Sequence, residues 1–149
     1  HYFDRGDYKK AKENFLLAIK TGSELPEAYY NMGFLLHKIP RSEEDLNEAI
    51  LYYNKTIEIK PEYQRAHQRL AEIYMENGRD LAKVRYHLEK LIELGTSDPS
   101  IYYNLSLVSH LLGSDIEALH WAEEGLILTE DDLQAVALFE DLIVKIKSE

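Results

Sequence analysis

The side chains best suited to chemistry in this sequence are its carboxylates and histidines. It has 27 Asp and Glu residues and six His. It has no Cys, which excludes disulfides, thiolate nucleophiles and Cys-ligated zinc. Acidic triplets at residues 43–45 and 130–132 resemble the oxygen ligands of a metal site. Both triplets lie where a helix is expected to start, and there negative charge offsets the helix dipole. We interpret them as helix starts and expect no bound metal.

The known signatures of catalysis are missing from the sequence. It contains no Gly-rich phosphate loop, no G-x-S-x-G and no H-E-x-x-H. A surface with 27 carboxylates always offers neighbouring pairs, so no acid–base dyad can be singled out. We therefore expect no catalytic residue, no cofactor and a function other than enzymatic.

The charge balance restricts the classes of partner. With 17 Lys and Arg against 27 acidic residues, the formal charge is −10, which disfavours nucleic acid and anionic membrane surfaces. The longest stretch without Asp, Glu, Lys or Arg covers residues 99–114, too short and too polar to span a bilayer. Hydrophobic residues make up 45% of the 149 residues, as in an ordinary globular domain.

No signal peptide is visible in the sequence. The sequence opens with His1 rather than Met, so we expect further sequence upstream. The lack of Cys is compatible with a reducing compartment, which favours the cytoplasm without deciding the location.

Two apolar patterns alternate along the chain. The first has the i, i+4, i+7 spacing of one helix face, and it opens at Ala11, Ala49, Val84 and Ala118. The second is a large apolar residue followed by a small one, at Met32-Gly33, Leu70-Ala71 and Leu105-Ser106. From each of the first three opening residues to the next small residue the spacing is 22, whereas the return spacing is 16, 13 and 12. This regularity predicts helix pairs packed in one constant way, with length variation in one set of loops.

Helix-capping residues divide the chain at the same places. Ser42, Asp98 before Pro99, and the acidic segment ending at Asp132 are expected to start helices. Residues 114–117, Ser-Asp-Ile-Glu, have the form of a capping box, in which the Ser114 hydroxyl accepts from a backbone amide. Gly78 and Gly113 are expected to end helices.

These features resemble the tetratricopeptide repeat. The segments that carry the resemblance are residues 26–33 (PEAYYNMG), 49–61 (AILYYNKTIEIKP) and 98–106 (DPSIYYNLS) followed by Ala118. Ser106, Val84, Leu91 and His67 depart from the usual residue types of the family. The resemblance implies an all-α fold, a right-handed α–α superhelix of stacked antiparallel helix pairs with a concave groove.

The expected organisation is a single domain over residues 1–149. Residues 1–22 form the second helix of a truncated repeat, with Tyr2 and Phe3 as the tail of its first helix. Three repeats follow at 26–61, 62–95 and 98–130, and 131–149 form a C-terminal capping helix. Six apolar residues of that helix are expected to cover the last pair: Val136, Leu138, Phe139, Leu142, Ile143 and Ile146.

In this family ligands lie mostly along the first helix of each pair. The resemblance therefore implies a groove lined by Glu27, Tyr30, Asn31, Phe34 and His37, by Arg65, Gln68, Arg69, Glu72 and Met75, and by Tyr103, Asn104, Leu107 and His110. We expect partner binding by nine of them, namely Tyr30, Asn31, Phe34, Arg65, Arg69, Glu72, Tyr103, Asn104 and Leu107. Rings and aliphatic groups would anchor a segment, the amides would bond its backbone, and the arginines would read an acidic group. His37 and His110 fall two repeats apart, roughly 16–20 Å at the usual helix spacing, which is too far for a shared metal.

One subfamily clamps the C-terminal carboxylate of heat-shock chaperones. Asn31, Arg65 and Arg69 match the later part of its pattern, with Arg in place of Lys, but the helix for the first part would precede residue 1. Glu72, one turn from Arg69, is placed to pair with it and cancel its charge.

The sequence favours a non-catalytic protein–protein interaction module that binds a peptide segment or partner helix in the groove. The alternative is a structural assembly segment of a larger protein, docking through its convex face or self-associating through its C-terminal helix. The truncated first repeat and the wide apolar face of the last helix motivate this alternative.

Overall fold

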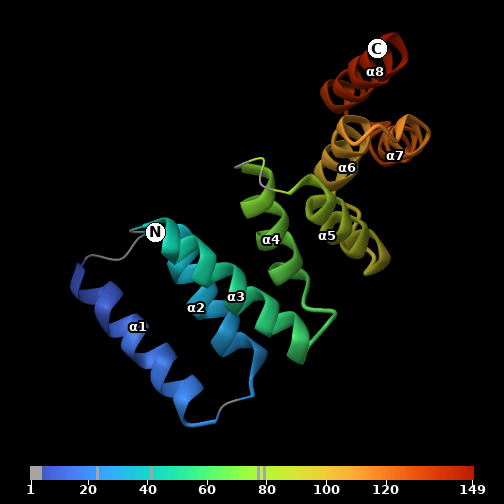
Figure 1. The fold of residues 1–149 in the computed structure, drawn as a ribbon. Coiled ribbons are helices and arrows are strands. Elements are labelled where there is room, and N and C mark those ends of the chain that lie inside the picture. Colours follow the sequence, from blue (N-terminus) through green and yellow to red (C-terminus); the bar gives the residue numbers. More distant parts are fainter. Residues whose placement is uncertain (1–4, 23, 41, 77, 79) are drawn as a thin grey trace. The chain divides into compact units, whose positions relative to one another are not determined.

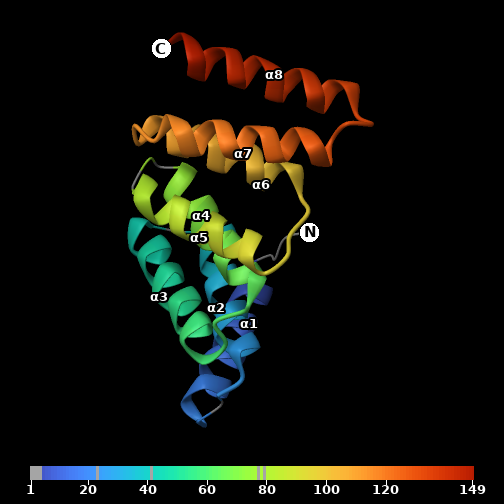
Figure 2. The ribbon, with the colours of Figure 1, turned by 90° about the vertical axis from the view of Figure 1, so that its right-hand side faces the viewer.

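A computed structural model describes residues 5–22, 24–40, 42–76, 78 and 80–149. Within them the chain forms eight helices and no strand (Figures 1 and 2). The helices are α1 (Arg5–Lys20), α2 (Pro26–Lys38), α3 (Glu43–Ile59), α4 (Gln64–Glu76), α5 (Leu81–Glu93), α6 (Pro99–Leu111), α7 (Asp115–Leu128) and α8 (Leu133–Ser148). The expected tail at Tyr2 and Phe3 lies outside the described residues.

Several helix starts are capped by the residues that the sequence indicated. The Ser42 hydroxyl accepts from the Asp45 amide at 3.3 Å. Asp98 accepts from the Ser100 amide at 3.0 Å, and Asp132 accepts from two amides of the first turn of α8, each at 3.1 Å. These caps satisfy amides that have no partner within their own helix.

The capping box predicted at residues 114–117 is wrong. The Ser114 side chain makes no capping bond to the start of α7, because its backbone (φ −102°, ψ 68°) lies outside the extended region from which an N-cap side chain reaches inward. Instead, the Ser114 amide donates to the Ser109 carbonyl at 2.8 Å and closes the turn after α6. Gly113 permits this turn with a φ of +85°.

The helices group into two compact units, unit 1 (residues 1–73) and unit 2 (residues 74–149). In unit 1, α2 packs on α1 and on α3. The Tyr53 ring of α3 lies so close to Gly33 of α2 that an added Cβ would be 2.9 Å from two ring carbons. The small residue of the Met32-Gly33 pair therefore allows the two helices to approach.

In unit 2, α6 packs on α5 and α7, and α7 packs on α8. The small residue of the third large–small pair is Ser106, which is fully buried. Its hydroxyl donates to the Ala118 carbonyl of α7 at 2.6 Å. This bond explains how a polar residue occupies a position where Gly or Ala is usual, because the buried hydroxyl has an acceptor.

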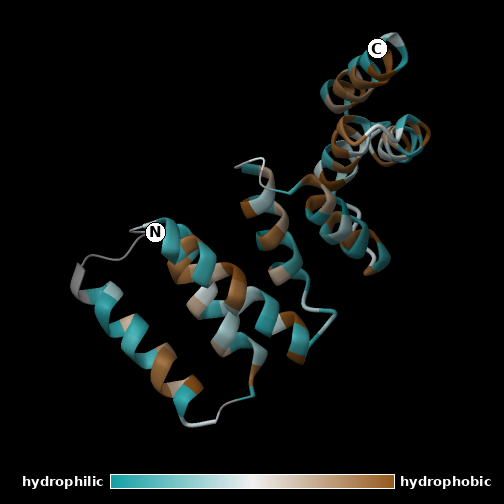
Figure 3. Ribbon diagram, viewed as in Figure 1, coloured by the Kyte–Doolittle hydropathy of each residue, from teal (hydrophilic) through white to brown (hydrophobic). Residues whose placement is uncertain are grey.

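Only some of the apolar residues of the capping helix α8 that were expected to cover the last helix pair are buried. Phe139, Leu142 and Ile146 are buried, whereas the Leu138 side chain is 57% exposed and was wrongly expected to cover the last pair. Leu133 and Val144 of α8 are also exposed. Hydrophobic and hydrophilic residues alternate along α8 (Figure 3).

The helix pairs form the all-α helical solenoid that the sequence predicted. Among the described residues, none of the helices has the length and apolar character needed to cross a membrane.

Candidate partner-binding surfaces

Unit 1 presents a cluster of aromatic and charged side chains on α2, on α4 and at the residue before α4. It is here called the arginine–tyrosine cluster (Tyr30, Phe34, Tyr63, Arg65, Arg69 and Glu72). The buried ring of Tyr30 lies at its centre. It lies 6.0 Å from the Phe34 ring, 5.5 Å from Tyr53 and 5.3 Å from Tyr63. This packing holds Tyr30 rigid, so the ring is a fixed platform for the cations above it.

Arg65 lies over two of these rings. Its guanidinium carbon is 4.9 Å from the Tyr30 ring centre and 5.5 Å from that of Tyr63, and one of its amino groups donates to the Tyr63 hydroxyl at 3.1 Å. The residue is exposed to solvent. Arg65 is therefore an oriented cation able to meet an anionic group.

Arg69 is instead held by internal partners. Its Nη1 donates to both Glu72 carboxylate oxygens at 2.9 and 3.1 Å, and its Nε donates to the Tyr30 hydroxyl at 3.2 Å. Glu72 also accepts from Lys38 of α2 at 3.4 Å. The pairing expected between Glu72 and Arg69 is thus present, and one carboxylate neutralises charge from two helices.

Two further predicted groove residues of α2 differ in their surroundings. Asn31 is exposed to solvent. His37 is buried, its Nδ1 lies 3.2 Å from the Tyr53 hydroxyl, and burial together with the charge of Lys38 lowers its pKa from 6.5 to about 4. His37 is therefore a neutral core side chain at pH 7.

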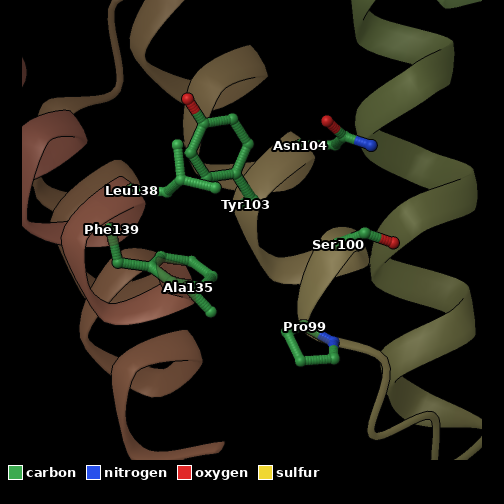
Figure 4. A pocket seen from close by; sticks show the side chains of 7 residues that line it. All are labelled: Pro99, Ser100, Tyr103, Asn104, Ala135, Leu138 and Phe139. Carbon is green, nitrogen blue, oxygen red and sulfur yellow. The ribbon is translucent and has the colours of Figure 1, made fainter. Parts of the chain in front are cut away.

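Unit 2 contains a cavity of about 340 Å³ between α6 and α8, here called the α6–α8 pocket. Its lining residues are Pro99, Ser100, Tyr103, Asn104, Ala135, Leu138 and Phe139. Figure 4 shows the Tyr103 ring beside Leu138, with Ser100 and Asn104 on the α6 side of the pocket and Phe139 on the α8 side. The Tyr103 and Phe139 rings meet edge to face at 5.6 Å, which fixes one wall.

The three residues of unit 2 that were predicted to bind a partner, Tyr103, Asn104 and Leu107, have different surroundings in the structure. Tyr103 and Asn104 line the pocket. Leu107 packs together with Tyr103 against Ala118, Leu142 and Ile146 and so contributes mainly to the core.

Sequence reasoning missed the contribution of α8 to this pocket. Leu138 and Phe139 were expected to cover the last helix pair, and Ala135 was given no role. The width of the apolar face of α8 could have revealed this role. The helix carries more apolar side chains than its packing against α7 can bury.

A third cluster joins the ends of α6, α7 and α8. His110 Nδ1 lies 2.7 Å from an Asp115 carboxylate oxygen, and its Nε2 lies 3.1 Å from a Glu149 carboxylate oxygen. The hydrogen bond to Asp115, followed by that to Glu149, raises the pKa of His110. Neither this cluster nor any other group of three or more His, Asp or Glu side chains in the described parts of the chain could hold a metal ion.

Comparison with known proteins relates this chain to one family of helical repeats. Residues 1–39 match the family described as TPR repeat. Solved structures with the same fold include YrrB, described as a TPR protein with an unusual peptide-binding site (TM-score 0.69, 23% identity, covering 91% of this chain and 67% of that one). They also include MamA, with a TM-score of 0.70 and 19% identity, covering 97% of this chain and 79% of that one. Pseudomonas aeruginosa pilF has a TM-score of 0.66 and 19% identity, covering 97% of this chain and 64% of that one.

Residues 1–39 thus match the tetratricopeptide repeat, and the chain as a whole has the fold of solved tetratricopeptide-repeat proteins. Among curated proteins it is similar to human RANBP2-like and GRIP domain-containing protein 1, with 24% identity over 137 residues and 89% of this chain. It is also similar to human E3 SUMO-protein ligase RanBP2, with 26% identity over 101 residues and 68% of this chain. The chain spans about 7% of the length of the first relative and 3% of the second.

Proposed function

We propose that this chain is a non-catalytic interaction module that binds a peptide segment or partner helix through the first helices of its repeats. The observation that carries the proposal is the α6–α8 pocket, a cavity of about 340 Å³ with apolar walls and a few polar groups at its edge. A cavity of this kind suits an apolar side chain of a partner, because most of the ligand surface is buried while polar groups fix its orientation.

The predicted residues divide into contacts and supports. Tyr103 would contact an apolar side chain of the partner directly, and Asn104 would bond its backbone. In unit 1, Phe34 is half-buried and Arg65 exposed, so both can touch a ligand, as can the amide of Asn31. Tyr30 is buried and Leu107 does not line the pocket, so these two residues would act mainly by holding the contacts in place.

The carboxylate clamp is the less favoured form of this function. A clamp needs cations free to bind a terminal carboxylate, but Arg69 is already paired with Glu72, and Glu72 also binds Lys38. A ligand carboxylate would have to displace the carboxylate of Glu72, which α4 holds beside Arg69 because residues three apart share a helix face.

The test is a peptide selection against the protein, displaying free and blocked C-termini side by side. We expect internal motifs with an apolar anchor to be enriched, and their affinity to fall at least tenfold in Tyr103→Ala and Asn104→Ala. Tyr86→Ala, which changes an exposed tyrosine of α5 that does not line the α6–α8 pocket, is the matched control and should bind normally. Enrichment of free acidic C-termini that is lost in Arg65→Ala/Arg69→Ala would instead support the clamp.

A second candidate is assembly of the chain through α8. It is favoured by the exposure of Leu133 (83%) and Val144 (65%), neither of which lines the pocket. Light scattering over a range of concentrations tests it. A monomer at high concentration would exclude self-assembly, whereas an oligomer that Leu133→Asp/Val144→Asp dissociates would establish it.

A further inference from the structure

The negative charge of this protein is distributed unevenly between its two units. Residues 1–73 carry 12 acidic and 11 basic residues, a formal charge of −1. Residues 74–149 carry 15 acidic and 6 basic residues, a formal charge of −9. Unit 2 therefore accounts for nearly all of the net charge of −10.

The asymmetry is sharpest around the α6–α8 pocket. Between residues 91 and 144 there is no Lys or Arg, while 11 residues are Asp or Glu. Every residue that lines the pocket belongs to this segment. The segment that lines the pocket thus contributes only negative charge, which favours cations over anions within about 10 Å at 0.1 M salt.

Two exposed carboxylates adjoin the lining residues directly. Asp98 precedes Pro99, and its Oδ1 accepts from the Ser100 amide and hydroxyl at 3.0 and 2.9 Å. Oδ1 of Asp132 accepts from the amides of Gln134 and Ala135, each at 3.1 Å. In all of these bonds only Oδ1 is used, so Oδ2 of each carboxylate is the oxygen offered to an incoming cation.

We infer that the α6–α8 pocket takes an apolar side chain from a basic amphipathic segment, with Lys or Arg residues flanking that anchor. The inference rests on the proposed function and adds the chemistry of the partner. The anchor would pack against Tyr103, Leu138 and Phe139, and the flanking cations would lie toward Asp98 and Asp132. Lys and Arg suit this arrangement because their aliphatic stems follow an apolar wall while their charged ends remain in water.

The probes are three 12-residue peptides of one design, acetylated and amidated so that they have no terminal charge. The first has Leu and Phe anchors and four Lys, the second has Glu in place of Lys, and the third keeps Lys but has Ser in place of the anchors. Binding to the whole chain is measured by calorimetry at 50 and 300 mM NaCl. We expect the first peptide to bind at least tenfold more tightly than either of the others, and several-fold more weakly at the higher salt.

Matched variants locate the binding. Leu138→Ser should weaken binding of the first peptide at least tenfold, whereas Val144→Ser, which changes another exposed residue of α8, should leave it unchanged. Asp98→Asn/Asp132→Asn should weaken it about tenfold, because Asn retains the helix caps but removes both charges. The control with the same change of net charge is Glu123→Gln/Glu124→Gln on α7, which should have little effect.

Equal binding of the Lys and Glu peptides would overturn the inference, and so would binding that is insensitive to Leu138→Ser. If the peptide selection enriches neutral or acidic sequences that depend on Tyr103 and Asn104, the proposed function stands and the inference fails. If neither the selection nor the designed peptides bind, both fail. A dimer that Leu138→Ser converts to a monomer would show that a second copy, rather than a basic segment, occupies the pocket.

Discussion

The ring of Phe139 in α8 lies directly against Gly125 in α7, so closely that a Cβ at position 125 would overlap ring carbons Cε1 and Cζ. Gly125 is buried within α7, and Phe139 is 2% exposed. This contact seats the capping helix, and the same ring forms one wall of the α6–α8 pocket.

Gly125→Ala should therefore destabilise unit 2. Replacing Gly by Ala inside a helix ordinarily stabilises a protein by up to about 1 kcal/mol, but overpacking costs about 1–3 kcal/mol. We expect a net loss of about 1–2 kcal/mol in the free energy of unfolding, measured by urea denaturation. Glu124→Ala, an exposed neighbour, should be close to neutral. Adding Phe139→Leu to Gly125→Ala should cost less than the sum of the two single changes, and strict additivity would contradict the contact.

The two buried serines of α6 should respond in opposite directions to Ala substitution. The Ser109 hydroxyl is buried without a hydrogen-bond partner among the described residues, whereas the Ser106 hydroxyl donates to the Ala118 carbonyl. We expect Ser109→Ala to stabilise the protein by about 1 kcal/mol, and Ser106→Ala to destabilise it by about the same amount. Thermal unfolding of the two variants beside the parent provides the measurement. Destabilisation by Ser109→Ala would show that its hydroxyl has an acceptor.

Removing the charge of Glu72 should change the ligand preference of unit 1. In Glu72→Gln, Arg69 and Lys38 lose the carboxylate that they share, so the arginine–tyrosine cluster gains one positive charge. We expect a short acidic peptide with a free C-terminus to bind this variant at least fivefold more tightly than the parent, as measured by calorimetry. Glu58→Gln, which removes an exposed charge of α3, is the control. If the parent already binds the free C-terminus as tightly, Glu72 does not compete with a ligand.

Acid should destabilise the protein through His37. Its pKa is about 4 in the folded state and 6.5 when unperturbed, so the unfolded chain binds the proton more readily. The contribution of neutral His37 is complete above pH 6.5 and is lost as the pH falls from 6.5 to about 4. The difference between these two pKa values corresponds to a loss of at most about 3 kcal/mol in the free energy of unfolding. As the pH falls from 6.5 to about 4, the parent should lose unfolding free energy relative to His37→Gln. A difference between the two proteins that does not change with pH would contradict this prediction.

His110 should have the opposite pH dependence. Its two ring nitrogens face two carboxylates, and both can donate only when the ring is protonated. Because its pKa is raised in the folded state, the stabilisation is complete below the unperturbed value of 6.5 and is lost as the pH rises through the folded value. An NMR titration of the His110 ring should give a midpoint above 6.5 that falls in Asp115→Asn. A midpoint unchanged by that variant would mean that the carboxylate does not hold the ring.

Local sequence signals were sufficient for the helices and for contacts within a helix. The Ser42, Asp98 and Asp132 caps depend on atoms two or three residues away, so their residue types predict them. The Arg69–Glu72 pair is predictable for the same reason, since residues three apart share a helix face. The capping box at Ser114 was wrong because the turn after α6 decides the backbone angle of that residue.

The sequence by itself therefore determined the helix pairs, their tetratricopeptide-like spacing and the concentration of negative charge in unit 2, because periodicity, capping and charge are properties of neighbouring residues or of composition. Tertiary structure alone decided that Arg69 bonds to Tyr30, 39 residues away, and that Leu138 and Phe139 of α8 complete a pocket with Tyr103 of α6. The physical reason is that an apolar stripe specifies which face of a helix is buried, whereas the partner of each side chain and the space left between partners depend on how two helices pack.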